Sequence, residues 1–181
     1  MDDKTIVYGE AIDTVDLTYT LTGALEVDTV VVTLEAVDYV AGAVPGTTFT
    51  IKATSTDNRY NFNVTNGTLT VVKKDVTVTA GSGTVVYGSE ADLSAVTSEV
   101  VGLVGEDTIT LTYTTDYVVG DGAGKSFNIV PAGTHDYYNV TFINGELTVL
   151  KKDATVALDD ASVTYGDQLP TLTAEVTGTV I

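Results

Sequence analysis

The sequence repeats itself at a spacing of 78 to 79 residues. A Tyr-Gly pair at Tyr8-Gly9 returns at Tyr87-Gly88 and again at Tyr165-Gly166. The segment NGTLTVVKKD, residues 66–75, returns as NGELTVLKKD at residues 144–153. Self-similarity at a fixed period is typical of tandem structural units, each of which contacts its neighbours in the chain. The sequence therefore predicts a row of similar small domains.

The repeat divides the chain into two complete units and part of a third. We place repeat 1 at residues 1–75, repeat 2 at residues 76–153 and a truncated start of repeat 3 at residues 154–181. Alternatively, the last segment supplies a strand that completes repeat 2. A repeat that begins a third time indicates a piece of a longer array. Each unit is large enough for one modest core, which buries roughly 60% of its unfolded surface.

The charge balance is strongly acidic, with 25 Asp and Glu against 8 Lys and Arg and a formal net charge of −17. Such a field repels phosphate backbones and anionic lipid headgroups, so we expect no nucleic-acid partner. No stretch approaches the roughly 18 apolar residues of a membrane span, so we expect no membrane insertion of this segment. Cysteine is absent, which excludes thiolate metal sites and favours a bacterial or archaeal surface over disulfide-stapled animal modules.

Thr and Val alternate along much of the chain, and alternating β-branched residues are the signature of a half-buried strand. In repeat 2 the pattern predicts seven strands, at residues 76–79, 84–87, 93–101, 108–114, 126–130, 137–143 and 146–150. The fold class is therefore all-β, with tandem small β-sandwich (Ig-like) repeats. The alternative is β-grasp-like units with one short helical turn near residues 91–96. Repeat 1 lacks a strand ahead of Lys4 equivalent to residues 76–79, so it either uses that downstream segment or keeps a bare edge.

Two local patterns concern the end of each repeat. Asn66-Gly67 and Asn144-Gly145 lie between alternating apolar runs and predict hairpins with type I′ turns, which require positive φ angles. The segments Lys73-Lys74-Asp75 and Lys151-Lys152-Asp153 then join one repeat to the next without a Gly, Pro or Ser spacer. Such a joint leaves little slack, so adjacent repeats of the same chain are expected to be partners in a stiff rod.

Candidates for chemistry are weak. The loop at residues 120–126, GDGAGKS, resembles a phosphate loop, but Val119 stands where that motif requires Gly, and the equivalent loop of repeat 1 has no lysine. His135 is the only histidine and has no partner set, so we interpret it as a surface residue. We therefore predict no catalytic residues, no cofactor-binding residues and no enzyme activity, since no Ser/His/Asp set or paired carboxylates recur at loop ends.

Calcium is the one metal that the acidic residues could hold. Candidate oxygen ligands lie at or near the seams between repeats: Asp75, Asp153, Asp159 and Asp160. Oxygen ligands at a stiff joint could fix the angle between domains, but no Asp-x-Asp-x-Asp-Gly loop is present. Solvated acids that prevent edge pairing are the default interpretation, and calcium is the alternative.

Tyrosines recur at matched positions. Tyr8, Tyr87 and Tyr165 each precede a glycine, and Tyr60 and Tyr138 each precede an asparagine. We predict that these are core tyrosines packed at strand ends, whose hydroxyls find backbone partners. An aromatic platform for sugars is the alternative.

An ordered set of motifs resembles a known family. The set comprises the Tyr-Gly pairs, the mid-repeat GLVGED at residues 102–107, the Tyr138-Asn139-Val140 strand and the closing NGELTV at residues 144–149. Together they resemble the MBG domain of the YGX type, found in tandem in large bacterial surface and adhesin-like proteins. Repeat 1 departs most, with GALEVD at residues 23–28 in place of the mid-repeat motif. The resemblance implies an extracellular location on a bacterial cell surface and a structural or adhesive role.

The leading functional hypothesis is a stalk or spacer of a bacterial cell-surface adhesin, a stiff rod that projects a binding region. The alternative is that the repeats themselves bind a host or matrix glycan or protein. Differences between the copies concentrate at residues 53–58 against 131–136 and at residues 43–46 against 121–124, which leaves binding open.

Overall fold

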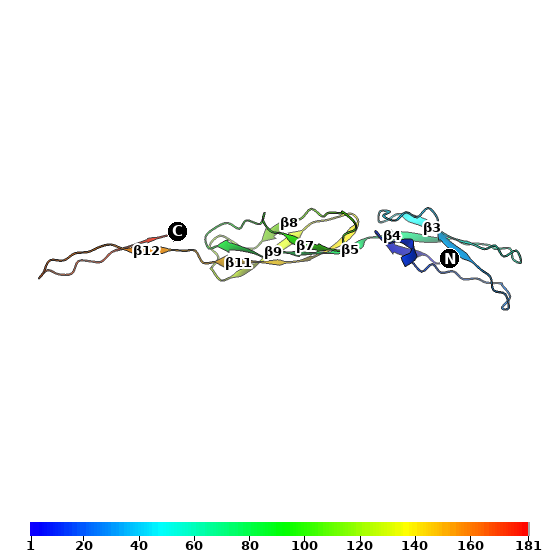
Figure 1. The fold of residues 1–181 in the computed structure, drawn as a ribbon, viewed down its shortest axis with the longest axis horizontal. Coiled ribbons are helices and arrows are strands. Elements are labelled where there is room, and N and C mark those ends of the chain that lie inside the picture. The colour runs from blue at the N-terminus through cyan, green and yellow to red at the C-terminus, as the bar shows by residue number, and fades with distance from the viewer. Residues whose placement is uncertain (181) are drawn as a thin grey trace. The chain divides into compact units, whose positions relative to one another are not determined.

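The computed structural model describes residues 1–180 and confirms an all-β protein (Figure 1). Repeat 1 contains β1 (Lys4–Val7), β2 (Thr33–Ala36), β3 (Thr48–Thr54) and β4 (Gly67–Val72). Repeat 2 contains β5 (Lys74–Ala80), β6 (Gly83–Val86), β7 (Ser98–Val101), β8 (Thr112–Thr115), β9 (Ser126–Ala132), β10 (Tyr138–Ile143) and β11 (Gly145–Leu150). The last segment contains β12 (Thr155–Leu158) and β13 (Ala174–Thr177).

Helix is nearly absent from the described residues, where the one helical segment is a 3₁₀ turn at Ile12–Thr14. Residues 91–97 form no helix, and a single turn closes there when Val96 N donates to Leu93 O at 3.2 Å. The helical turn of the β-grasp alternative is therefore not found in repeat 2. No helix among residues 1–180 has the length and apolar character needed to cross a membrane.

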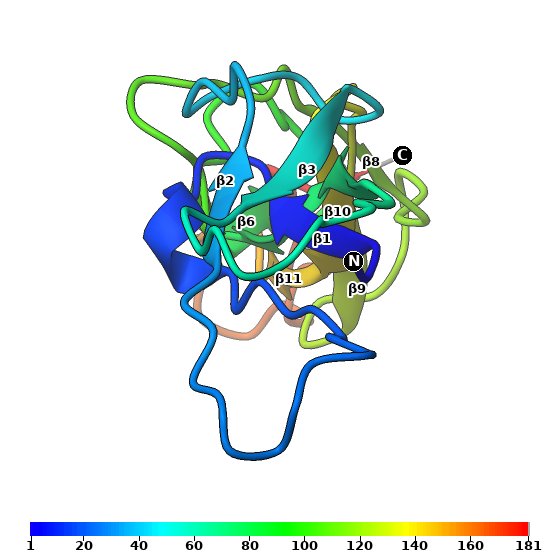
Figure 2. The same ribbon diagram turned by 90° about the vertical axis from the view of Figure 1, so that its right-hand side faces the viewer.

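Each repeat contains its own four-stranded sheet, and the two sheets have equivalent strand orders. The order is β1-β4-β3-β2 in repeat 1 and β6-β11-β9-β8 in repeat 2. The parallel pairs are β1 with β4 and β6 with β11, and the other neighbours pair antiparallel. The registers match as well, because Leu69 pairs with Lys4 and the equivalent Leu147 pairs with Gly83. Figure 2 shows β1, β2 and β3 of the first sheet from the end of the molecule that bears the N-terminus.

A second sheet, in the order β10-β5-β7, forms in repeat 2. The last segment holds a two-stranded version, in which β12 and β13 pair antiparallel from Thr155–Thr177 to Leu158–Ala174. β5 begins within the double-lysine joint, at Lys74, and β12 begins shortly after the second joint, at Thr155. Repeat 1 does not use β5 to complete its own sheet, because β5 pairs with strands of repeat 2.

The Asn-Gly hairpins predicted from the sequence are wrong. The strands on either side of Asn144-Gly145, β10 and β11, belong to different sheets, and neither Gly67 nor Gly145 has a positive φ. Glycine is required here for a different reason. A Cβ at Gly67 would lie 2.7 Å from the carbonyl oxygen of Asp2, and a Cβ at Gly145 would collide with that of Gly81. The pair marks a crossing from one sheet to the other, where two backbones nearly touch.

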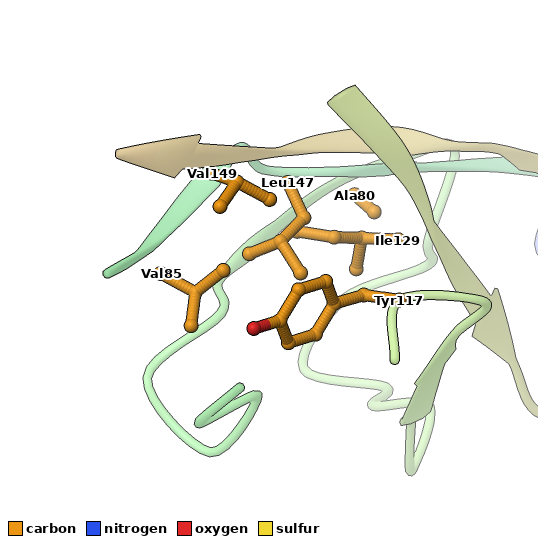
Figure 3. Packing of buried hydrophobic residues seen from close by; sticks show 6 residues of the cluster. All are labelled: Ala80, Val85, Tyr117, Ile129, Leu147 and Val149. Carbon is orange, nitrogen blue, oxygen red and sulfur yellow. The ribbon is translucent and has the colours of Figure 1, made fainter. Parts of the chain in front are cut away.

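The core of repeat 2 follows from alternation along the central strand. Leu147 and Val149 on β11 point to the same face and meet Ala80, Val85, Tyr117 and Ile129 (Figure 3). Tyr117 also donates its hydroxyl to the carbonyl oxygen of Ser89 at 2.8 Å, so its polar end is satisfied. This core is small, and the aromatic rings of Tyr87, Tyr113 and Phe127 pack against its buried side chains.

By compactness the chain divides into two units that do not follow the sequence repeats. The first unit is Met1–Thr77, Val100–Thr110 and Gly133–Thr141, and the second is Val78–Glu99, Leu111–Ala132 and the residues from Phe142 on. The first unit therefore contains two loops of repeat 2, at residues 100–110 and 133–141. The boundaries placed from the sequence at residues 75 and 153 stay a prediction.

We expect truncation of Ile129 to be among the most destabilising changes in this core. Ile129 is 0% exposed, so Ile129→Ala should lower the free energy of unfolding by about 2–5 kcal/mol. Its neighbour Val130 is 39% exposed, and Val130→Ala should cost under about 1 kcal/mol. Urea unfolding of both variants measures the difference, and equal losses would contradict the assigned strand faces.

Candidate functional site

The recurring Tyr-Gly pair follows β1 or β6 and lies next to the end of the last strand of the same four-stranded sheet. Because β1 and β4 are parallel and in register, both strands finish at the same end of the sheet. Tyr8 then continues the ladder, since its N–H donates to Val72 O at 2.9 Å. Tyr87 does the same with Leu150 O at 2.9 Å after β6 and β11. The double-lysine joint begins directly after those carbonyls, so each Tyr-Gly pair stands beside the start of the following segment.

In the first compact unit Tyr8 meets the mid-repeat motif of repeat 2 at a half-buried carboxylate. Tyr8 Oη donates to Asp107 Oδ2 at 3.1 Å, and Tyr138 Oη donates to the same oxygen at 2.5 Å. Tyr138 Oη in turn accepts from Val104 N at 2.9 Å. We call Tyr8, Val104, Asp107 and Tyr138 the tyrosine–aspartate clasp. It ties Tyr8 of the first repeat to Asp107 and Tyr138 of the second.

Aromatic packing surrounds the clasp. The rings of Tyr8 and Tyr138 meet edge to face with centroids 5.6 Å apart, and Tyr137 lies 5.1 Å from Tyr8. Tyr8 is 8% exposed and Tyr138 is 2% exposed. His135 packs against Tyr138 with ring centroids 4.9 Å apart, and its Nδ1 accepts from Tyr137 N at 3.2 Å. The histidine thus closes one side of an aromatic cluster.

The glycine of the Tyr-Gly pairs at Tyr8-Gly9 and Tyr87-Gly88 permits a close approach of a second segment. Gly9 has a φ of 82°, and a Cβ there would lie 2.5 Å from a methyl group of Val104. Gly88 has a φ of 81°, and a Cβ there would collide with Val180, the residue that corresponds to Val104 in the last segment. The left-handed backbone and the missing side chain are both needed. The Tyr-Gly pair therefore works as a docking element, with the hydroxyl of Tyr8 directed to Asp107 and Gly9 seated against Val104.

Repeat 1 contains the same arrangement without a tyrosine from another repeat. Tyr60, the counterpart of Tyr138, donates its hydroxyl to Asp28, and the hydroxyl accepts from Leu25 N at 3.0 Å. Arg59 occupies the other carboxylate oxygen of Asp28 at 2.5 Å. The intrarepeat half of the clasp is thus an invariant part of both repeats, and Tyr8 adds the interrepeat half in the first unit.

The clasp perturbs the acidity of its tyrosines. Burial first, and then the hydrogen bond to Asp107, raise the pKa of Tyr138 to about 12. Burial and the same carboxylate also raise the pKa of Tyr8. Both effects disfavour the phenolate, because burial removes its hydration and Asp107 is already negative. The clasp therefore requires both hydroxyls to be protonated.

The tyrosine prediction is confirmed in part. Tyr8 and Tyr138 are buried at strand ends, and the Tyr138 hydroxyl has the expected backbone partner in Val104 N. Both hydroxyls also donate to the carboxylate of Asp107, which was not expected, and Tyr165 is fully exposed, so the prediction is wrong there. Sequence reasoning missed Asp107, which lies 99 residues from Tyr8. The signal was available, because Asp28 and Asp107 recur within the mid-repeat motif at the spacing of the repeat.

The calcium candidates are either hydrogen-bonded to other side chains or exposed. Asp75 accepts from Asn139 Nδ2 at 3.0 Å, and Asp159 accepts from Thr173 Oγ1 at 2.5 Å. Asp153 and Asp160 are exposed. Within residues 1–180 no three His, Cys, Asp or Glu side chains gather as a metal site would require. Calcium at the seams stays a prediction.

The glycine-rich loop at residues 120–126 connects β8 to β9 and precedes no helix. Gly124 N donates to Val149 O at 2.8 Å, and the equivalent Gly46 N donates to Val71 O at 2.9 Å in repeat 1. Both glycines also have a positive φ, 90° at Gly46 and 88° at Gly124, which explains why both loops keep glycine here although only one has a lysine.

Comparison with known proteins supports the resemblance noted in the sequence. The family model of the MBG domain (YGX type) matches residues 1–70 and again residues 76–148. The two matches reproduce the tandem repeat and together span most of the chain. No curated protein matches the sequence.

Removing one hydroxyl should expose the contribution of the clasp. In Tyr138→Phe the carboxylate of Asp107 loses a donor and Val104 N loses its acceptor, so the free energy of unfolding should fall by about 1–3 kcal/mol near neutral pH. Tyr165 is 104% exposed, and Tyr165→Phe is the matched control with no expected effect. Chemical unfolding of the two variants measures this difference in stability. Indistinguishable unfolding curves would contradict the clasp.

Alkaline pH should also weaken the folded state. The folded pKa of Tyr138 is about 12, above the unfolded value of about 10, so its contribution is complete below about pH 10 and is lost as the pH rises towards 12. In that window the unfolded chain binds fewer protons than the folded one, which gives stability a negative slope against pH. Tyr138→Phe should flatten that slope. A wild-type stability that is constant between about pH 10 and 12 would contradict the assignment.

Proposed function

Because the chain belongs to the MBG domain (YGX type) family, we propose that it serves as a stalk of a bacterial cell-surface adhesin and holds a binding region away from the cell. Tandem repeats of this family indicate a repeat region of a surface protein. The family is a structural domain of surface proteins and is not a known enzyme family. The stalk role, the adhesin and the extracellular location are the parts that we add.

The tyrosine–aspartate clasp is the observation that carries this proposal. It couples residues of two successive repeats through a half-buried carboxylate, two hydroxyl donors and a glycine contact, all next to a joint of three residues. Such a junction resists bending because a hinge motion there would separate the two buried tyrosines from the carboxylate that accepts their hydrogen bonds. A stalk needs this property, whereas an independent binding domain has no use for it.

The placement of the aromatic residues supports the same role. Tyr8 and Tyr138, which recur with the repeat, are buried in the first unit and are therefore used for structure. A platform for sugars would present such rings to solvent. The net charge of −17 suits a stalk that must remain soluble and must not pair sideways with other stalks.

Spin-label distances can measure the stiffness directly. The chain has no cysteine, so the double variant Lys52→Cys/Thr134→Cys places one label on β3 of repeat 1 and one at an exposed position of repeat 2, both within the first compact unit. We expect a narrow distance distribution between the two labels. Adding Asp107→Ala should broaden it, because both tyrosine hydroxyls lose their acceptor.

The control for this experiment is Asp116→Ala, which removes an exposed carboxylate from repeat 2 and should leave the distribution unchanged. A broad distribution in the parent protein would overturn the rigid stalk. Repeating the measurement with calcium and with a chelator tests the seam aspartates separately. A change on chelation would assign them a metal.

A further inference from the structure

The first two strands of repeat 2 lie beside its last two. β6 pairs with β11 in parallel, from Gly83–Leu147 to Val86–Leu150. β5, which precedes β6 in the chain, is the neighbour of β10, which precedes β11. We call the segment β5–β6 and the segment β10–β11 beside it the parallel seam.

One register holds along the parallel seam. At its start Lys74 N donates to Tyr137 O at 3.1 Å. At its end Tyr87 N donates to Leu150 O at 2.9 Å. The acceptor lies 63 residues after the donor in both cases (137 − 74 and 150 − 87). The two backbones also stay in contact where the chain crosses between the sheets, since a Cβ at Gly145 would collide with the opposite backbone.

The strands that adjoin the two joints are both interior to their sheets. β5, which begins within the joint from repeat 1, lies between β10 and β7, and β11, which precedes the second joint, lies between β6 and β9. Alternate side chains anchor them, because Val76 and Val78 on β5 and Leu147 and Val149 on β11 are at most 2% exposed. Sliding either strand along its axis would break two ladders and expose buried apolar surface.

Parallel pairing determines how tension acts on these strands. Tension along the chain enters the seam at the start of its first segment and leaves at the end of its last. Because β6 and β11 are parallel, Gly83 at the start of β6 and Leu150 at the end of β11 lie at opposite ends of the pair. The pull then runs along the strands and loads the evenly spaced ladder bonds together. In an antiparallel pair both points would lie at one end, and the bonds would break one after another.

We propose that the parallel seam is a tension clamp, which gives the repeat a further function: it carries a stretching load along the chain without unfolding. In repeat 1, β1 and β4 form the corresponding parallel pair, which Tyr8 N extends by its bond to Val72 O. The inference goes beyond the stalk role, because the tyrosine–aspartate clasp resists bending between repeats whereas the seam resists stretching of one repeat. Each property can hold without the other.

Pulling single molecules between two chosen cysteines tests the clamp. The chain has no cysteine, so handles attach only where one is introduced. Ser82→Cys/Lys151→Cys places the handles at opposite ends of the β6–β11 pair, and Ser89→Cys/Lys151→Cys places both beyond the same end. All three positions are exposed. The two variants share one anchor and differ in the direction of the load.

At equal constant force the variant with handles at opposite ends should remain folded at least about tenfold longer, because each additional hydrogen bond broken in the same step contributes about fivefold. Equal lifetimes, or a longer lifetime for the other variant, would overturn the clamp. Urea unfolding without load is the control. It should give both variants the same free energy of unfolding, so that the difference in lifetime reports the direction of the load.

A second pair of anchors at one end makes the test independent of Ser89. Lys73→Cys/Asp136→Cys places both handles at the start of the seam, beside the bond from Lys74 N to Tyr137 O, and both positions are exposed. The load would again open the bonds one at a time, so this lifetime should also be short. A lifetime as long as that of Ser82→Cys/Lys151→Cys would contradict the proposal. A narrow spin-label distribution together with equal lifetimes would overturn the clamp and leave the stiff stalk in place.

Discussion

Parallel pairing of β1 with β4, and of β6 with β11, is the constraint from which the other features follow. Because β4 lies beside β1 and runs in the same direction, the end of β4 lies next to the end of β1. The Tyr-Gly pair after β1 and the joint after β4 are therefore neighbours, although more than sixty residues separate them. An antiparallel pairing would have sent Tyr8 to the opposite end of the sheet, away from the start of the next repeat. The position of the clasp is thus a result of strand direction.

The sheets themselves supply little hydrophobic material, which explains the importance of polar contacts. This cluster of repeat 2 gathers six buried side chains, two of them from one face of β11, and the chain contains neither tryptophan nor cysteine. A core of this size gives limited stability, so backbone crossings at Gly67 and Gly145 and hydrogen bonds to Asp28 and Asp107 define much of the geometry. Partly buried polar groups of this kind are destabilising when unpaired, which makes them specific for one arrangement.

The sequence predicted the strands and the repeat well, because alternation and self-similarity are local or periodic signals. Seven strands were expected in repeat 2, and β5 to β11 are seven, with the largest shifts at residues 93–101 and 108–114. It misjudged Asn144-Gly145, because glycine signals either a positive φ or a close backbone approach, and only the neighbouring Gly81 distinguishes them. Asp107 was missed because its partners Tyr8 and Tyr138 come from different repeats. Contacts of this kind depend on how the chain returns to itself, which no single window of sequence records.

The clasp also has a consequence for how such genes can change. The first junction takes Tyr8 and Gly9 from one repeat and Val104 and Asp107 from the following one. Gly88 and Val180 repeat the glycine contact at the next junction, and the Tyr-Gly pairs recur at a fixed spacing. If one whole repeat is deleted or duplicated, the Tyr-Gly pair of one repeat again precedes the mid-repeat motif of another. The new junction therefore needs no compensating mutation. Recombination between copies can therefore lengthen or shorten the array in units of one repeat. Selection can then act on the length of the array while each repeat keeps its fold.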